Sequence, residues 1–151
     1  MKAIHCLFIP WAIALAACHA PSIDSETRPV GTNVLPPAVL AGALNGEPDF
    51  VRHVAPILRE RCLYCHEPPA LPGHLSLASR EEAMTPGPAG PVIVPGKPAG
   101  SPLIRSLKGT HPGTAAMPAV GDQVTRDEIR VLERWISIGA PWPEGPAGRL
   151  R

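Results

Sequence analysis

The stretch Arg61-Cys62-Leu63-Tyr64-Cys65-His66 decides how the rest of the chain is organised. Its centre is the pattern Cys-x-x-Cys-His, in which an imidazole directly follows the second of two closely spaced thiols. This pattern is the signature of covalent haem attachment, where each thiol adds across one vinyl group of the porphyrin. The tether holds the histidine where its ring can bind the iron. We therefore predict that Cys62 and Cys65 attach a haem and that His66 is an axial ligand.

Two other chemistries use the same residue types. A thioredoxin-type redox pair, or a simple disulfide in an oxidising compartment, needs only the two cysteines, but the redox fold also needs a β-α-β context that is not visible here. A zinc site needs four ligands, and His74 or His111 would have to join Cys62, Cys65 and His66. Haem attachment also requires export and a distant sixth ligand. The chain offers candidates for both, so we favour haem.

The candidates for the sixth ligand are two methionines and two histidines. A thioether is a soft ligand that favours ferrous iron. Met84 falls in a predicted helix, where core packing accounts for it, whereas Met117 lies in a predicted loop and is followed by Pro118. The proline stiffens the backbone that presents the thioether. We predict Met117 as the second axial ligand, ahead of His111 and His74, which we expect to face solvent.

The N-terminus is typical of an export signal. A positively charged start precedes an apolar run over residues 7–17 that is too short to span a membrane. The run ends in Leu15-Ala16-Ala17-Cys18, which resembles a bacterial lipobox and implies cleavage before Cys18 and acylation of that cysteine. The alternative is cleavage after Ala20, which gives a soluble periplasmic protein. We expect an exported lipoprotein on the periplasmic side of a bacterial membrane.

Length and composition favour one small domain with long loops. The chain has 151 residues and a net charge of +1, which gives no reason to expect nucleic acid as a partner. Aromatic residues make up only 4%, while 21 prolines and 14 glycines predict irregular connections. A buried haem can supply the missing apolar area. We predict a lipoprotein signal peptide at 1–17, a lipid-anchored flexible linker at 18–46, the domain at 47–143 and a disordered tail at 144–151.

Apolar spacing and capping patterns predict the helices. Residues 48–61 place apolar side chains at helical spacing, although Pro56 interrupts the pattern, and His53 should face outward. Three further helices are predicted to begin at Ser79, Ser101 and Thr125, each from an N-cap signal. In the last of these, the expected buried stripe is Ile129, Leu132, Trp135 and Ile136. We predict an all-α domain of three to five short helices, joined by long loops around one covalent haem.

Several motifs together carry a family resemblance. They are Val54-Ala55-Pro56-Ile57-Leu58, Cys62–His66, Leu75–Ser79, Pro95–Pro98, Ser101–Ile104, Met117-Pro118, Thr125–Ile129, Trp135-Ile136 and Gly139–Pro143. Through them, residues 50–143 resemble class I cytochromes c, and more narrowly the cytochrome c-like domains of planctomycete-type proteins. The resemblance implies His66 and Met117 as axial ligands, and first and last helices that cross near Trp135. Val124 stands where leucine is usual.

The expected function is that of a mono-haem c-type cytochrome that carries single electrons between redox protein partners. Both axial positions would be filled, so we expect no catalysis and no enzyme activity. One alternative is a haem-based sensor or ligand-binding module, in which a small gas displaces Met117. Another is an electron-transfer subunit of a larger envelope oxidoreductase. The expected cofactor is one covalent haem c, and the expected membrane contact is a lipid anchor on Cys18.

Overall fold

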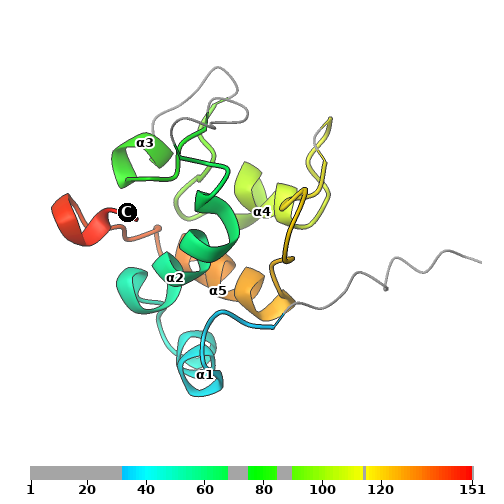
Figure 1. Ribbon diagram of the computed structural model, residues 1–151. Coiled ribbons are helices and arrows are strands. Elements are labelled where there is room, and N and C mark those ends of the chain that lie inside the picture. Colours follow the sequence, from blue (N-terminus) through cyan, green and yellow to red (C-terminus); the bar gives the residue numbers. More distant parts are fainter. Residues whose placement is uncertain (1–31, 68–74, 85–89, 114, 151) are drawn as a thin grey trace, which may run out of the picture.

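A computed structural model describes residues 32–67, 75–84, 90–113 and 115–150 (Figure 1). Within these ranges the regular structure is helical, without a β-strand, which confirms the predicted all-α class. The α-helices are α1 (Pro37–Asn45), α2 (Ala55–Leu58), α3 (Arg80–Met84), α4 (Pro102–Leu107) and α5 (Arg126–Ser137). The predicted signal peptide and the first part of the linker, with Cys18, lie outside the described residues. No helix in the described ranges is long and apolar enough to cross a membrane.

The helix that leads into the cysteine motif runs without a break from residue 50 to residue 63. It consists of the π-helical turn η1 (Phe50–Val54), then α2, then a second π-helical turn, η2 (Arg59–Leu63). The side chain of Asp49 caps its start by accepting the amide proton of Arg52 at 2.7 Å. Pro56 lies inside this continuous helix, directly after the π-helical turn η1, and its missing N–H removes one backbone hydrogen bond there. The proline does not end the helix.

One face of this helix forms part of the core. Phe50, Val54, Ile57 and Leu58 are all buried, as their spacing predicted. His53 is also buried, and its Nδ1 accepts a hydrogen bond from the backbone N–H of Asp49 at 2.8 Å. The prediction that His53 faces outward was wrong, because the π-helical turn departs from the 3.6-residue spacing on which it rested.

Helix α5 packs against elements from both the N-terminal and the middle part of the described chain. It contacts α1, η1, α4 and the 3₁₀ turn η4 (Pro98–Gly100). The predicted capping box is present: Thr125 Oγ1 accepts from the N–H of Glu128 at 3.1 Å, and Glu128 Oε2 accepts from the N–H of Thr125 at 2.9 Å. Leu132, Trp135 and Ile136 are buried as predicted, together with Val131, whereas Ile129 is only partly buried.

An aromatic cluster joins the first and last parts of the domain. The rings of Phe50 and Trp142 stack at 4.5 Å, and Trp135 lies 6.0 Å from Phe50 and 5.9 Å from Trp142. Both indole N–H groups are satisfied by backbone carbonyls, those of Pro141 and Gly148. With few aromatic residues in the chain, this cluster concentrates the apolar area where η1 meets α5.

The structure corrects the predicted linker over residues 32–46. Pro37–Asn45 forms α1, which packs against α5, and Leu35, Leu40 and Ala43 are buried. Proline at the first position of a helix is favourable, and the single glycine in α1 costs only about 1 kcal/mol. Burial of the apolar side chains of α1 outweighs that cost. We call residues 32–36 the N-terminal arm.

The predicted disordered tail is also corrected. Residues 143–150, called here the C-terminal strap, include the 3₁₀ turn η5 (Gly145–Gly148) and end with a buried Leu150. The N–H of Leu150 donates to the carbonyl of Ala78 at 3.0 Å, and Arg59 Nε donates to the carbonyl of Leu150 at 2.9 Å. The strap thereby links the segment before α3 to the helix that precedes the cysteines. In Figure 1 the C-terminal end lies beside α3.

Candidate haem site

The side chains of the two cysteines and the adjacent histidine extend from a single turn at the end of η2. The N–H groups of Cys65 and His66 both donate to the carbonyl of Cys62, at 3.2 and 3.0 Å. Cys62 is buried, Cys65 and His66 are half-buried, and both thiols are free. The motif therefore forms a compact unit at the end of a helix that packs against the core.

The ring of His66 is oriented by a backbone carbonyl. Its Nδ1 lies 3.3 Å from the carbonyl oxygen of Leu75, and its own carbonyl accepts the N–H of Leu77 at 2.7 Å. Because a carbonyl can only accept, Nδ1 carries the proton and Nε2 keeps its lone pair. Burial also lowers the pKa of His66 and favours the neutral ring. Metal-binding histidines are typically held in this way.

The thiol of Cys62 is poorly suited to redox exchange. Burial raises its pKa to about 12, so the thiol is protonated at neutral pH. Reactive redox cysteines require a thiolate. In the described part of the chain, no group of three or more His, Cys, Asp or Glu residues is arranged to hold a metal ion; His74 lies outside that part. These observations favour haem attachment over zinc or disulfide exchange.

Met117 lies on the loop that follows α4. Gly109 follows the C-cap of that helix, and its φ of +66° allows the N–H of Thr110 to reach the carbonyl of Arg105 at 2.8 Å. The N–H of Met117 returns to the same helix end and donates to the carbonyl of Ser106 at 3.0 Å. Its side chain is half-buried against the core. The loop is therefore anchored to α4 at the residue predicted to bind iron, on a different element from the cysteine motif.

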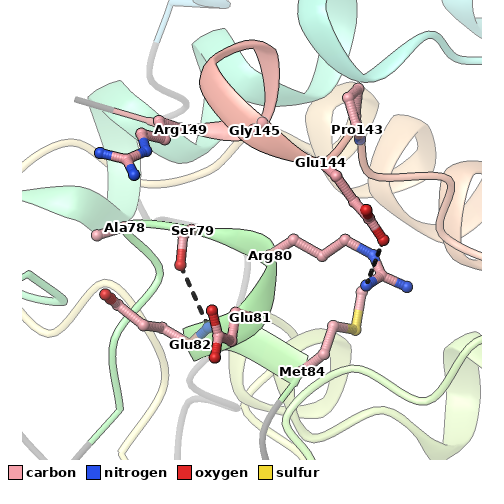
Figure 2. Close-up of a pocket in the computed structure, with 11 residues that line it drawn as sticks. Ala78, Ser79, Arg80, Glu81, Glu82, Met84, Pro143, Glu144, Gly145 and Arg149 are labelled. Atoms are coloured by element: carbon pink, nitrogen blue, oxygen red, sulfur yellow. Dashed lines mark hydrogen bonds and ion pairs between the residues drawn. The ribbon is translucent and has the colours of Figure 1, made fainter.

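Met84, the rival methionine, borders a charged cavity. This cavity of about 870 Å³ lies between α3 and the C-terminal strap (Figure 2). Its charged lining residues are Arg80, Glu81, Glu82, Glu144 and Arg149. None of the four predicted haem residues lines it, and a charged wall is unlike the apolar surroundings of a porphyrin. Met84 therefore lies in the kind of environment where a packing role is sufficient.

Sequence reasoning missed one feature beside the motif. Arg61 directly precedes Cys62, and its side chain forms a buried ion pair with Glu128 of α5. The capping box predicted the contact of Glu128 with Thr125 but not its complete burial. Helical spacing could have predicted this burial, because Glu128 lies on the same helix face as Leu132 and Trp135, which follow it by four and seven positions.

Comparison with known protein families gives a match over this site. Residues 62–119 match the model of the family described as Planctomycete cytochrome C. The matched range includes both cysteines, His66 and Met117, and it confirms the resemblance inferred from the sequence. No curated protein and no solved structure matches the chain.

Proposed function

We propose that this protein, which carries a planctomycete cytochrome c segment at residues 62–119, transfers single electrons between protein partners in the cell envelope. The observation that carries the proposal is the geometry of one turn. This turn carries the side chains of Cys62, Cys65 and His66. Because Nδ1 of His66 contacts the carbonyl of Leu75, its Nε2 is free to bind a metal.

The residues present fit one covalent haem c. Cys62 and Cys65 would hold it through thioether bonds, and His66 and Met117 would bind its iron. When bound, it supplies reversible one-electron chemistry at the iron. Arg105 offers a further sign of fit: its Nε is buried and has no hydrogen-bond partner among the described residues. The propionates of a haem are anions of the kind that a buried guanidinium binds well.

The protein's own side chains would set the direction of the redox equilibrium. Buried apolar residues beside the motif, such as Leu63 and Leu77, would limit the access of water to the haem, which disfavours the additional positive charge of ferric iron. Thioether ligation by Met117 acts in the same direction. Both effects raise the reduction potential, and with both axial positions occupied there is no open position for a substrate. We therefore propose an electron carrier rather than an enzyme.

Visible spectra of the purified mature protein during a redox titration test the proposal. An electron carrier should give low-spin spectra that carbon monoxide leaves unchanged, with a thioether-to-ferric band near the red end of the ferric spectrum. Ready binding of carbon monoxide to the reduced protein would instead favour the sensor function. Absence of covalent haem in the exported protein would refute the proposal.

We also propose attachment to a membrane through lipid on Cys18. Acyl chains contribute roughly 0.8 kcal/mol of membrane affinity per buried methylene, so several chains on one cysteine give a firm anchor. Replacement of Cys18 by serine should move the protein out of the membrane fraction or leave it unprocessed. Unchanged fractionation would argue for the alternative of a soluble periplasmic protein.

The proposed partners are redox proteins that dock near the motif. The side chain of Tyr64, between the two cysteines, is 88% exposed, and Val120, three positions after Met117, is also exposed. Exposed apolar side chains at both haem-binding segments suit a transient interface. Co-purification of a dehydrogenase or reductase would identify the alternative, an electron-transfer subunit of a larger oxidoreductase.

A further inference from the structure

The ion pair between Arg61 and Glu128 is buried directly beside the haem-attachment turn. The side chain of Arg61 is 5% exposed and that of Glu128 is completely buried. Arg61 Nη2 lies 3.2 Å from Glu128 Oε1, and Arg61 Nε lies 3.3 Å from Oε2. This two-point contact is the geometry that a guanidinium forms best with a carboxylate.

The same pair holds the N-terminal arm. Glu128 Oε1 accepts the N–H of Val34 at 2.6 Å, and Arg61 Nη2 donates to the carbonyl of Thr32 at 2.5 Å. The other oxygen of Glu128 accepts the N–H of Thr125. Three segments that are distant in sequence thus meet at one pair of charges.

Arg61 Nη1 also lies 3.6 Å from Oδ2 of Asp122, a side chain that is 83% exposed, so solvent screens this second contact. Removal of Glu128 would leave Arg61 with this screened partner alone, and removal of Arg61 would leave the carboxylate of Glu128 buried without a charge partner.

Both charges lie next to the attachment point. Arg61 directly precedes Cys62 in the chain, and its two hydrogen bonds to Glu128 bring that carboxylate to the same turn. Buried charges are screened much less by salt than exposed ones. Their effects on a haem bound to Cys62 should therefore be appreciable singly and should largely cancel when both are present.

We propose that Arg61 and Glu128 are a positioning pair that fixes the attachment turn against α5 and keeps the net buried charge beside the haem near zero. This inference rests on the proposed function. Ferric haem carries one more positive charge than ferrous haem, so an uncompensated arginine disfavours the ferric state and raises the reduction potential. An uncompensated glutamate has the opposite effect.

The test is the midpoint potential of the haem-loaded protein in four forms, all measured in the same buffer. Glu128→Gln, which keeps one oxygen acceptor and nearly the same shape, should raise the potential. Arg61→Gln should lower it. The double variant should return close to the wild-type value. A purely structural defect does not produce shifts of opposite sign that cancel.

A surface ion pair on neighbouring elements supplies the matched control. Lys108 Nζ and Glu133 Oε1 are 2.6 Å apart, and both side chains are partly exposed. Solvent screens such pairs, so Lys108→Gln and Glu133→Gln should shift the potential much less than the buried variants. Shifts of the same sign in both Arg61→Gln and Glu128→Gln, or shifts no larger than those of the controls, would overturn the proposal.

A conservative variant separates charge from geometry and covers a failure of Arg61→Gln to fold. Arg61→Lys keeps the positive charge but loses the two-point contact. It should lower the thermal unfolding midpoint while leaving the potential near the wild-type value; a large potential shift would contradict the charge argument. If the wild-type chain carries no covalent haem, the proposed function is refuted. The positioning role is then tested by the unfolding midpoints of Arg61→Lys and Glu128→Gln alone: lower midpoints support it, and unchanged midpoints refute it.

Discussion

His66 is fixed at two points by the segment that begins at Leu75. Its ring contacts the carbonyl of Leu75, and its backbone carbonyl accepts the N–H of Leu77. Leu77 is itself buried, so this segment is held in the core. An imidazole that is oriented before the cofactor arrives loses little conformational entropy on binding iron. The ligand predicted with the strongest sequence signal is therefore also the one with the clearest structural support.

Met117 and Met84 can be distinguished by paired substitutions. Met117→Ala should abolish the thioether-to-ferric band and lower the reduction potential, because a soft ligand that favours ferrous iron is lost. Met84→Ala is the control and should leave both properties intact, since Met84 borders the charged cavity, which none of the predicted haem residues lines. Visible spectroscopy and potentiometric titration measure both effects. The assignment is wrong if Met84→Ala is the damaging change.

His53 should make stability depend on pH. Burial, the largest cause, lowers its pKa below the ordinary value of 6.5, and Arg52 acts in the same direction. Between the unfolded pKa and the lower folded pKa, the unfolded chain binds a proton that the native ring does not. Stability is thus lost as pH falls below about 6.5. Urea unfolding at several pH values should show a smaller loss on acidification in His53→Gln; equal losses would refute this role.

Among the secondary-structure elements, the helix ends depend most on residues that are close in sequence. The Thr125 capping box opens α5, and Gly139, with φ of +101°, allows the N–H of Ala140 to reach the carbonyl of Trp135 at its end. Ser101 differs: it stands at the N-cap of α4, but its hydroxyl bonds the preceding loop at Val94 and Lys97. The N-cap position of Ser101 was predicted correctly. The hydrogen-bond partners of its hydroxyl lie in a loop whose conformation the neighbouring sequence does not determine.

Gly148 is the tightest point of the C-terminal strap. A Cβ at this position would lie 1.8 Å from the carbonyl oxygen of Pro143, and the indole of Trp142 is also in contact. Gly148→Ala should therefore destabilise the protein by about 1–3 kcal/mol. Gly42→Ala in α1 is the matched control, since nothing lies within 4 Å of its added Cβ.

In that control we expect a gain of about 0.5–1 kcal/mol, because alanine is favoured over glycine inside a helix. Chemical denaturation of both variants measures the difference. A loss of stability in Gly42→Ala, or no loss in Gly148→Ala, would contradict the packing described for these two elements.

For the whole molecule, the segments on either side of the predicted domain complete its core. The N-terminal arm and α1 cover α5, and the C-terminal strap closes over Ala78 and Arg59. Leu35 and Leu150, one from each segment, are both buried. In a chain with few aromatic residues, these contributions extend the apolar interior beyond the helices that surround the motif.

Leu150→Ala tests whether the strap belongs to the core. Loss of a buried leucine should cost about 2–5 kcal/mol, and the thermal unfolding midpoint should fall accordingly. Ile138→Ala is the control: that side chain is exposed, so the expected change is about 0.5 kcal/mol or less. If Leu150→Ala behaves like the control, residues 144–150 are the disordered tail that the sequence predicted.

The helices around the motif were predictable because their signals are local. The apolar spacing of Phe50, Val54 and Leu58 and the cap at Thr125 each depend on residues a few positions apart. Residues 32–46 belong to the predicted linker and residues 144–150 to the predicted tail, because both segments are short and rich in proline and glycine. Their order comes from contacts with residues far away in the chain, such as Leu150 with Ala78.

The sequence by itself determined that two thiols and an imidazole lie within five residues, which is the pattern on which the proposed haem site rests. It also indicated Met117 as the partner ligand, from its loop and the proline that follows. Only the tertiary structure decided that Arg61 would be neutralised by Glu128 and that the arm would close on that pair. Burial of charge is a property of packed surfaces, and such surfaces exist only once distant segments have met.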